Sequence, residues 1–371
     1  MLLHGESGTG KSWLYKKTFA DLSVSYLVAN LANASRLGSI SAELKNLVDR
    51  EGQAVKKGYE EEKSAELNAG FASGALSHTG DYELGQKEPF ERALELLRYK
   101  AKSSLAVLVF DNLEAAFNEQ MLKELANMLI LCDDARYATY KVKILIVGVP
   151  GGVKEYYYKT PHHSTVANRL YELPEVSRLE RRECAELIRK GFEDKLKYKV
   201  GSLDKVTNHI TWICDRIPQI VHEYCLELAF LGEGNLVIDE DSLRIANDIW
   251  LSKSQYHAYS IVESNMNERD TKAGRRNQTL YALSLCEGDQ FKASEIEANI
   301  RQEFPNSTHD TVLNTAQILA SLAFGERPVV RRSPKGDAYT FADPRYRMVL
   351  RAMLFKTADE RVDRKPLSRR E

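Results

Sequence analysis

The stretch GESGTGKS, residues 5–12, constrains the fold more than any other part of the sequence. It fits the pattern GxxxxGK[ST] and stands between an apolar run, LLH, and a helical pattern, KSWLYKKTFADL. The glycines of this pattern let the backbone wrap closely, so that successive N–H groups and the helix N-terminus face phosphate oxygens. The expected contact residues are Gly5, Glu6, Ser7, Gly8, Thr9, Gly10, Lys11, Ser12 and the adjacent Trp13. Lys11 is expected to reach the terminal phosphates and Ser12 to ligate Mg²⁺.

Residues 1 to about 175 alternate short apolar runs with helical patterns, which is typical of a parallel α/β sheet. The runs LAVLVF and VKILIVGV have no polar alternation, as expected for strands covered on both faces. A glycine-rich and charged stretch at about 50–87 interrupts the alternation of strand-like and helical patterns and predicts an inserted loop or small hairpin. It is either a solvated connection or a loop that contacts a substrate or another subunit.

The rest of the chain predicts two further domains. Residues 176–260 read as a helical lid subdomain of four helices, the first opened by a capping box from Ser177 to Glu180. Residues 277–355 show three helices followed by two strand-like runs, which predicts a winged-helix domain. In that domain we expect a capping box from Ser294 to Glu297 and a helix from Thr308 to Leu322, and residues 356–371 read as a disordered tail.

Acidic residues follow the apolar run LAVLVF. Asp111 stands where a P-loop site needs an acid that holds the metal through water. Glu114 is close enough downstream to orient or deprotonate an attacking water, although a surface acid at a helix start is the alternative. The next strand ends in Gly148-Val149-Pro150, which has no polar side chain to sense a γ-phosphate. Arg169 could reach the γ-phosphate of a neighbouring subunit or form a surface salt bridge.

These features, in this order, resemble the AAA+ ATPases of the origin-recognition and transposition-helper branch, together with the related STAND-type ATPases. The residues that carry the resemblance are GESGTGKS, VFDNLE, IVGVP, NRLYELPEV, ECAELIRKGF, CDRIPQIVHEYCLELA and YTFADPRYRMVLRAML. The resemblance covers nearly the whole chain. It implies an α/β P-loop domain with a helical lid and a C-terminal winged helix, ATP and Mg²⁺ as ligands, and an ATP hydrolase.

The chain departs from that family at two places in the site. Many such ATPases carry the catalytic base directly after the aspartate, where this chain has Asn112. The family's lid motif often has a phosphate-contacting arginine directly after the proline, where this chain has Gln219. Arg216 could substitute for it, or could cap a helix or form an ion pair. With no polar γ-phosphate sensor either, slow hydrolysis by a nucleotide-controlled switch is a serious alternative.

Charge is spread unevenly along the chain. The formal net charge is -1, so any contact with nucleic acid must come from a local patch. Residues 325–371 contain 13 basic and 7 acidic positions, a local net of +6. The winged helix of the resembling family commonly binds duplex DNA, but the helix expected in the groove contains no Lys or Arg. The candidate backbone-contacting residues are Arg327, Arg331, Arg332 and Lys335 around the wing. Three further arginines, Arg345, Arg347 and Arg351, follow in the sequence.

The remaining composition excludes several other classes. The five cysteines are scattered and never spaced as CxxC, which favours reduced thiols in a cytoplasmic protein over a disulfide framework or a zinc site. No apolar run approaches the roughly 20 residues of a membrane span. A small-molecule kinase is disfavoured because the chain ends in a winged helix and no acceptor site is visible.

Two hypotheses follow. In the first, an ATP-hydrolysing machine assembles on duplex DNA as a homo-oligomer; in the second, a switch holds nucleotide and signals to a protein partner. One further expectation concerns the start of the chain. Only four residues precede Gly5, whereas a sheet strand usually runs about five or six. The resembling ATPases also have an upstream segment that covers the adenine, so we expect a truncated chain, a misassigned start or an unusually exposed base.

Overall fold

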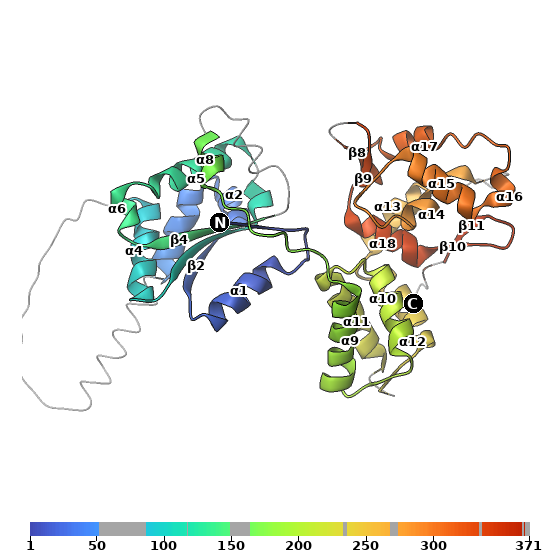
Figure 1. Ribbon diagram of the computed structural model, residues 1–371, viewed down its shortest axis with the longest axis horizontal. Helices are drawn as coiled ribbons and strands as arrows, with labels where there is room; N and C mark the ends of the chain where they lie inside the picture. The colour runs from blue at the N-terminus through green and yellow to red at the C-terminus, as the bar shows by residue number, and fades with distance from the viewer. Residues whose placement is uncertain are drawn as a thin grey trace, which may run out of the picture. The chain divides into compact units, whose positions relative to one another are not determined.

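The computed structural model describes residues 1–51, 87–116, 118–148, 164–232, 236–267, 274–333, 336–365 and 367. The chain forms two compact units, Met1–Ser177 and Arg178–Glu371 (Figure 1). Most of the insertion predicted at about 50–87 lies outside the described residues. No helix in these described ranges is long and apolar enough to cross a membrane.

A parallel sheet forms the centre of the first unit. Its strand order is β1-β4-β3-β2, and every neighbouring pair is parallel. The strands are β1 (Leu2–His4), β2 (Ser25–Asn30), β3 (Ala106–Asp111) and β4 (Val142–Gly148). Because every neighbouring pair is parallel, the chain must cross over the sheet between one strand and the next. The predicted parallel α/β sheet is confirmed.

Helices cover both faces of this sheet. Tyr15 of α1 (Lys11–Asp21) packs with Val107 and Val109 of β3 on one face. Residues of α4 (Pro89–Ala101) and α5 (Glu119–Leu131) pack with the alternate side chains of β3 on the other (Figure 1). All six residues of β3 are buried, which explains why its sequence lacks polar alternation. The other elements of this unit are α2 (Leu31–Leu37), helical residues 40–51, the 3₁₀ helix η1 (Leu113–Ala116), α6 (Ala135–Ala138) and α8 (Ser164–Arg169).

An extended segment after α8 runs alongside β1. The backbone N–H of Leu2 donates to the carbonyl of Tyr171 at 2.8 Å, and the N–H of Leu173 donates to the carbonyl of Leu2 at 2.9 Å. Further along, the N–H of Val176 donates to the carbonyl of His4 at 2.8 Å. These bonds bring the chain that leaves the first unit beside the start of the glycine loop.

The second unit begins with a helical part. Ser202 caps α10 and Asp239 caps α12, each through its side-chain oxygen. The short strands β5 (Lys199–Val200) and β6 (Val237–Ile238) pair in parallel. The helices are α9 (Arg181–Arg189), which continues as the π-helix η2 (Lys190–Lys195), α10 (Leu203–Ile213), α11 (Pro218–Gly232), α12 (Glu240–Ser252) and α13 (Tyr256–Ser264).

The C-terminal part combines helices with a small antiparallel sheet. The sheet order is β7-β9-β8, with β7 (Gln290–Phe291), β8 (Val330–Arg332) and β9 (Tyr339–Phe341). Strands β10 (Leu354–Lys356) and β11 (Val362–Arg364) form a separate hairpin. The helices are α14 (Arg275–Ser284), α15 (Ala293–Glu303), α16 (Pro305–Thr308), α17 (Thr315–Leu322) and α18 (Pro344–Met353).

Both parts of the second unit share one hydrophobic core. Cys184 of α9, Trp250 of α12 and Met353 of α18 all belong to the same buried cluster. Helix α18 contacts α10, α12, α13 and α14. The sequence suggested two domains here, whereas the described residues form a single packed unit.

Several predicted boundaries are wrong. The helix expected after Ser177 begins only at Arg181, and Glu183 accepts a hydrogen bond from the Glu180 N–H. Ser294 lies inside α15, where Glu295 accepts from the Lys292 N–H.

The C-terminal predictions also need correction. The helix expected from Thr308 to Leu322 starts only at Thr315, because Asn314 adopts a left-handed conformation with φ of 55° and breaks the pattern. The predicted disordered tail from 356 is wrong for Val362–Arg364, which pairs with β10. That pairing places the half-buried Val362 against the core of the second unit.

Candidate functional site

The glycine loop connects β1 to α1. Gly10 precedes the helix with φ of 92°, a conformation that glycine adopts without steric cost. At Gly5 the constraint is space, because a Cβ atom there would lie 2.4 Å from the carbonyl oxygen of Val176 and 3.0 Å from Thr9 Oγ1. The Thr9 hydroxyl donates to the Glu6 carbonyl at 3.0 Å and closes the turn. Both glycines are therefore needed for the shape of the loop.

Lys11 folds back over the loop. Its ammonium donates to the carbonyls of Gly5 at 2.8 Å and Glu6 at 2.7 Å. Burial lowers the pKa of Lys11, and the nearby carboxylates of Glu114, Asp111 and Glu6 counteract that shift. The positive charge therefore lies inside the loop with acidic groups around it. A phosphate placed in the loop would meet this charge.

Asp111 ends β3 directly opposite the start of α1. Its Oδ2 accepts hydrogen bonds from the Ser12 hydroxyl and the Tyr15 hydroxyl, each at 3.0 Å. Its Oδ1 accepts from the backbone N–H of Asn112 at 2.9 Å. The structure thus brings together Ser12 and Asp111, the two residues predicted to share a metal ion, and adds Tyr15.

Glu114 lies in η1, just beyond Asp111. Its side chain is exposed, and its carboxylate is the largest of the acidic influences on the pKa of Lys11. Glu114 also lies near the end of β4, since its Oε2 is 3.6 Å from the place a Cβ atom on Gly148 would take. That Cβ atom would lie only 2.9 Å from the Cβ of Leu113, so η1 approaches β4 too closely for a side chain at 148. Val149 and Pro150 lie outside the described residues.

The other predicted residues of the first unit have different surroundings. Trp13 is 69% exposed on α1. Arg169 is exposed at the end of α8, and its Nε donates to Asp133 at 2.6 Å. This is the salt bridge that the sequence offered as the alternative to a role at a neighbour's site. A role at a neighbouring subunit stays a prediction.

Arg216 and Gln219 belong to the second unit. Arg216 is half-buried with φ of 60°, and its carbonyl accepts from the N–H of Leu179 at 3.0 Å. Gln219 is exposed as the second residue of α11, after Pro218. Contact of either residue with nucleotide stays a prediction.

The predicted basic patch is only partly available to a ligand. Arg327, Arg331 and Arg332 are exposed, although the guanidinium of Arg332 lies 5.7 Å from the ring centre of Tyr339. Lys335 lies outside the described residues. Arg345 pairs with Asp343 at 2.5 Å.

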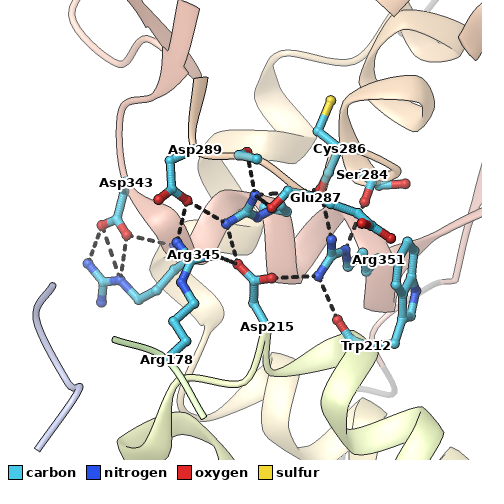
Figure 2. Close-up of polar contacts among 12 residues, drawn as sticks. Arg178, Trp212, Asp215, Ser284, Cys286, Glu287, Asp289, Asp343, Arg345 and Arg351 are labelled. Carbon is cyan, nitrogen blue, oxygen red and sulfur yellow. Dashed lines mark hydrogen bonds and ion pairs between the residues drawn. The ribbon is translucent and has the colours of Figure 1, made fainter. Parts of the chain in front are cut away.

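Arg347 and Arg351, which follow the predicted patch and contribute to the local net charge of +6, have buried side chains. Only 2% and 3% of their side chains are exposed, and both pair with the buried carboxylate of Asp215, Arg351 at 3.0 Å. Arg178 pairs with the same carboxylate at 2.8 Å. Figure 2 shows Asp215 between Arg178 and Arg351, with Asp289 beyond. Two arginines that the sequence counted toward a phosphate-binding surface therefore serve as internal partners, and the local net of +6 overstates the exposed charge.

Sequence reasoning missed Tyr15 and Asp215. Tyr15 lies three residues after Ser12, so the two share one face of α1, and this spacing was the signal available. Asp215 gives no local signal, because its three arginine partners are 37, 132 and 136 positions away in sequence. Such a cluster is visible only once the chain is folded.

Comparison with known proteins supports the fold of the first unit. Residues 1–157 match the family model described as "AAA domain". Together with the parallel sheet and the glycine loop, this match gives the first unit the fold of an AAA-type P-loop ATPase. No curated protein sequence gives a significant match to the chain.

Solved structures resemble nearly the whole chain. A Walker-type ATPase of Pyrococcus abyssi is 14% identical with a TM-score of 0.51, and the match covers 95% of this chain and 90% of that one. Cdc6p from Pyrobaculum aerophilum is 14% identical with a TM-score of 0.43, and covers 95% and 86% of the two chains. The ORC2 protein of Aeropyrum pernix is 13% identical with a TM-score of 0.45, and covers 95% and 85%. At the two lower scores the likeness is too loose to support a conclusion.

Proposed function

We propose that the chain binds ATP together with Mg²⁺ at the glycine loop and hydrolyses it. One observation carries the proposal: the Ser12 hydroxyl and the Asp111 carboxylate meet at 3.0 Å, directly after a loop whose carbonyls hold the Lys11 ammonium. Such a constellation of cation, hydroxyl and carboxylate suits a nucleotide phosphate chain with its metal ion.

The donor set fits magnesium. Mg²⁺ prefers oxygen ligands and is usually held by one or two protein groups plus phosphates and water. Ser12 Oγ and the Asp111 carboxylate offer such oxygens at one place, and these two residues would hold the ion. When bound, the ion would neutralise negative charge on the phosphate oxygens. The two residues would hold it between the start of α1 and the end of β3.

Lys11 and Glu114 supply the remaining chemistry. Lys11 would leave the carbonyls of Gly5 and Glu6 and place its charge on the terminal phosphate oxygens. Glu114, exposed in η1 and close to Lys11, would accept a hydrogen bond from the attacking water and orient it, or take its proton. Since no side chain fits at position 148, the chain would have no polar side chain there to contact the γ-phosphate, and turnover would be slow.

We further propose that the C-terminal part is a winged helix that contacts the DNA backbone. Helices α14, α15 and α17 with the sheet β7-β9-β8 supply the necessary elements, and Arg331 is exposed on the edge strand β8. Helix α17 has no cationic side chain, so contacts to base edges are not expected from it. Binding would be directed to phosphates and sensitive to salt. In this hypothesis the protein assembles on DNA as a homo-oligomer, with Arg169 completing a neighbour's site.

A second candidate is a nucleotide-controlled switch that signals to a protein partner. The ion pairs of Asp215 favour it, because they join the loop between α10 and α11 to α18 through fully buried groups. Asp215 directly precedes Arg216, the residue that could substitute for the phosphate-contacting lid arginine of the resembling family. A change at Arg216 would then reach α18 through a rigid connection.

An ATPase assay with and without duplex DNA tests these proposals. The variants are Lys11→Ala, which should abolish nucleotide binding, and Glu114→Gln, which should bind ATP but turn over at least ~10²-fold more slowly. Stimulation of the wild-type chain by DNA supports assembly on DNA. Binding without turnover supports the switch. Full turnover in Glu114→Gln would refute the role of that residue, and failure of the wild-type chain to bind ATP would refute the proposed function.

A further inference from the structure

Tyr15 is buried beside the proposed metal site. The residue is 3% exposed, and its ring packs in the small core between α1 and the sheet with Val107 and Val109. Phenylalanine would fill the same apolar space, so packing alone does not explain the hydroxyl. Among the described residues, that hydroxyl donates a hydrogen bond to Oδ2 of Asp111 at 3.0 Å.

The hydroxyl of Tyr15 can only donate to this carboxylate. Burial raises the pKa of Tyr15, and the neighbouring charge of Asp111 raises it further, so the phenol stays protonated throughout the physiological range. A hydrogen bond from a buried neutral donor to a carboxylate is strong and directional. It fixes the carboxylate without neutralising its charge.

The three donors to Asp111 are not equivalent. Asn112 donates its backbone N–H to Oδ1, whereas Ser12 and Tyr15 both donate to Oδ2. Ser12 is the residue that the proposed function assigns to the metal ion, so its hydroxyl oxygen would then be shared with the metal. Tyr15 is buried three residues further along α1, and the proposed function assigns its hydroxyl no contact with the metal ion. It is the side chain that can hold Oδ2 both with and without the metal.

We propose that Tyr15 is a positioning residue that fixes the Asp111 carboxylate for Mg²⁺, an inference that rests on the proposed function of this site. Groups that hold a metal-binding carboxylate typically change metal affinity by about 10- to 100-fold when they are removed. Tyr15→Phe should therefore weaken the use of Mg²⁺ while it leaves the contacts of the loop with nucleotide unchanged.

The matched control is Tyr26→Phe. Tyr26 belongs to the same aromatic group, with its ring 6.3 Å from that of Tyr15, and within the described ranges no hydrogen bond joins its hydroxyl to Asp111. Both variants remove one hydroxyl from neighbouring rings. Only one of them removes a donor to the carboxylate.

The experiment measures binding of a fluorescent ATP analogue to the full chain, first in EDTA and then during a Mg²⁺ titration. Tyr15→Phe should bind the analogue in EDTA as the wild-type chain does, and should need about tenfold more Mg²⁺ to reach half of the metal-dependent change. Tyr26→Phe should follow the wild type in both. An unchanged Mg²⁺ midpoint in Tyr15→Phe overturns the inference.

A double-mutant comparison separates positioning from a general loss of stability. In an Asp111→Asn background, Tyr15→Phe should no longer alter the Mg²⁺ midpoint, because its effect acts through the carboxylate. An equal shift in both backgrounds overturns the inference. If the wild-type chain binds the analogue without any response to Mg²⁺, both the proposed function and this inference fail. If wild type and Tyr15→Phe respond to Mg²⁺ with the same midpoint, only this inference fails.

Discussion

The guanidinium carbon of Arg351 lies 3.9 Å from the centre of the Trp212 ring, on the helix that leads into Asp215. The same guanidinium donates to the Trp212 carbonyl at 2.8 Å and to Asp215 Oδ1 at 3.0 Å. Stacking and hydrogen bonding use the face and the edge of one planar group, which lysine could not do. Arg351 thereby joins α18 to the end of α10.

Removing the charge of Asp215 should destabilise the second unit. Asp215→Asn would leave the buried guanidinium of Arg351 without its counter-charge and that of Arg347 with only the exposed Asp289, and breaking a buried pair in this way costs about 3–5 kcal/mol. Glu297→Gln breaks the exposed pair with Arg301 on α15 and should cost about 1 kcal/mol or less. Urea unfolding measures both. Equal losses in the two variants would contradict a structural role for the buried cluster.

Gly5→Ala should disrupt the glycine loop. The added Cβ atom would meet the Val176 carbonyl at 2.4 Å, and overpacking of this kind costs about 1–3 kcal/mol. Because the chain beside β1 must move, we expect lower affinity for a fluorescent ATP analogue as well. Gly38→Ala is the control, since Gly38 has φ of 75° but open space around it. That variant should lose stability without losing nucleotide affinity; wild-type affinity in Gly5→Ala would contradict the expectation.

Arg331→Ala should weaken binding to duplex DNA about equally for any base sequence. Each lost phosphate contact should lower the slope of log affinity against log salt by about 1. Arg244→Ala removes an exposed arginine of α12 and should leave this slope unchanged. Fluorescence anisotropy across a salt series measures the slopes. If both variants have the wild-type slope, β8 does not contact DNA phosphates.

Stability of the second unit should fall as the pH drops below about 6.5. Burial lowers the pKa of His209, the hydrogen bond with Asn247 raises it, and the charge of Lys365 lowers it again, with a lower value as the net result. The unfolded chain therefore takes up a proton near the usual pKa of about 6.5, while the folded chain resists it. His209 lies between Tyr224 and Asn247, at 3.1 Å from each.

The His209→Gln variant tests this dependence. Glutamine keeps a hydrogen-bonding group but cannot take up a proton in this range. Melting temperatures from about pH 8 to about pH 5 should fall less steeply for the variant than for the wild-type chain. Parallel profiles would mean that another group causes the loss of stability in acid.

Local patterns in the sequence predicted the elements that carry the nucleotide chemistry. The glycine motif and the apolar run before Asp111 both depend on residues close together in sequence. These predictions succeed because spacing and apolar period fix which side chains can face a sheet.

The predictions that failed depend on distant residues. Arg347 and Arg351 read as surface cations because no local signal links them to Asp215. Ser177 and Ser294 have the right spacing for capping boxes, but glutamates at other positions make the bonds, so the helices start elsewhere. The hairpin at Val362 follows a polar stretch whose composition alone suggested disorder.

The backbone at Asn112 bears on how this site can change over evolutionary time. Asn112 has φ of 62°, which asparagine tolerates better than glutamate, and its amide donates to Asn30 at 3.0 Å. A single mutation to glutamate would place a strained residue there and break the contact with Asn30. The position of Glu114, two residues after Asn112, is therefore linked to this turn. An acid at position 112 would require the backbone of the turn to change together with the side chain.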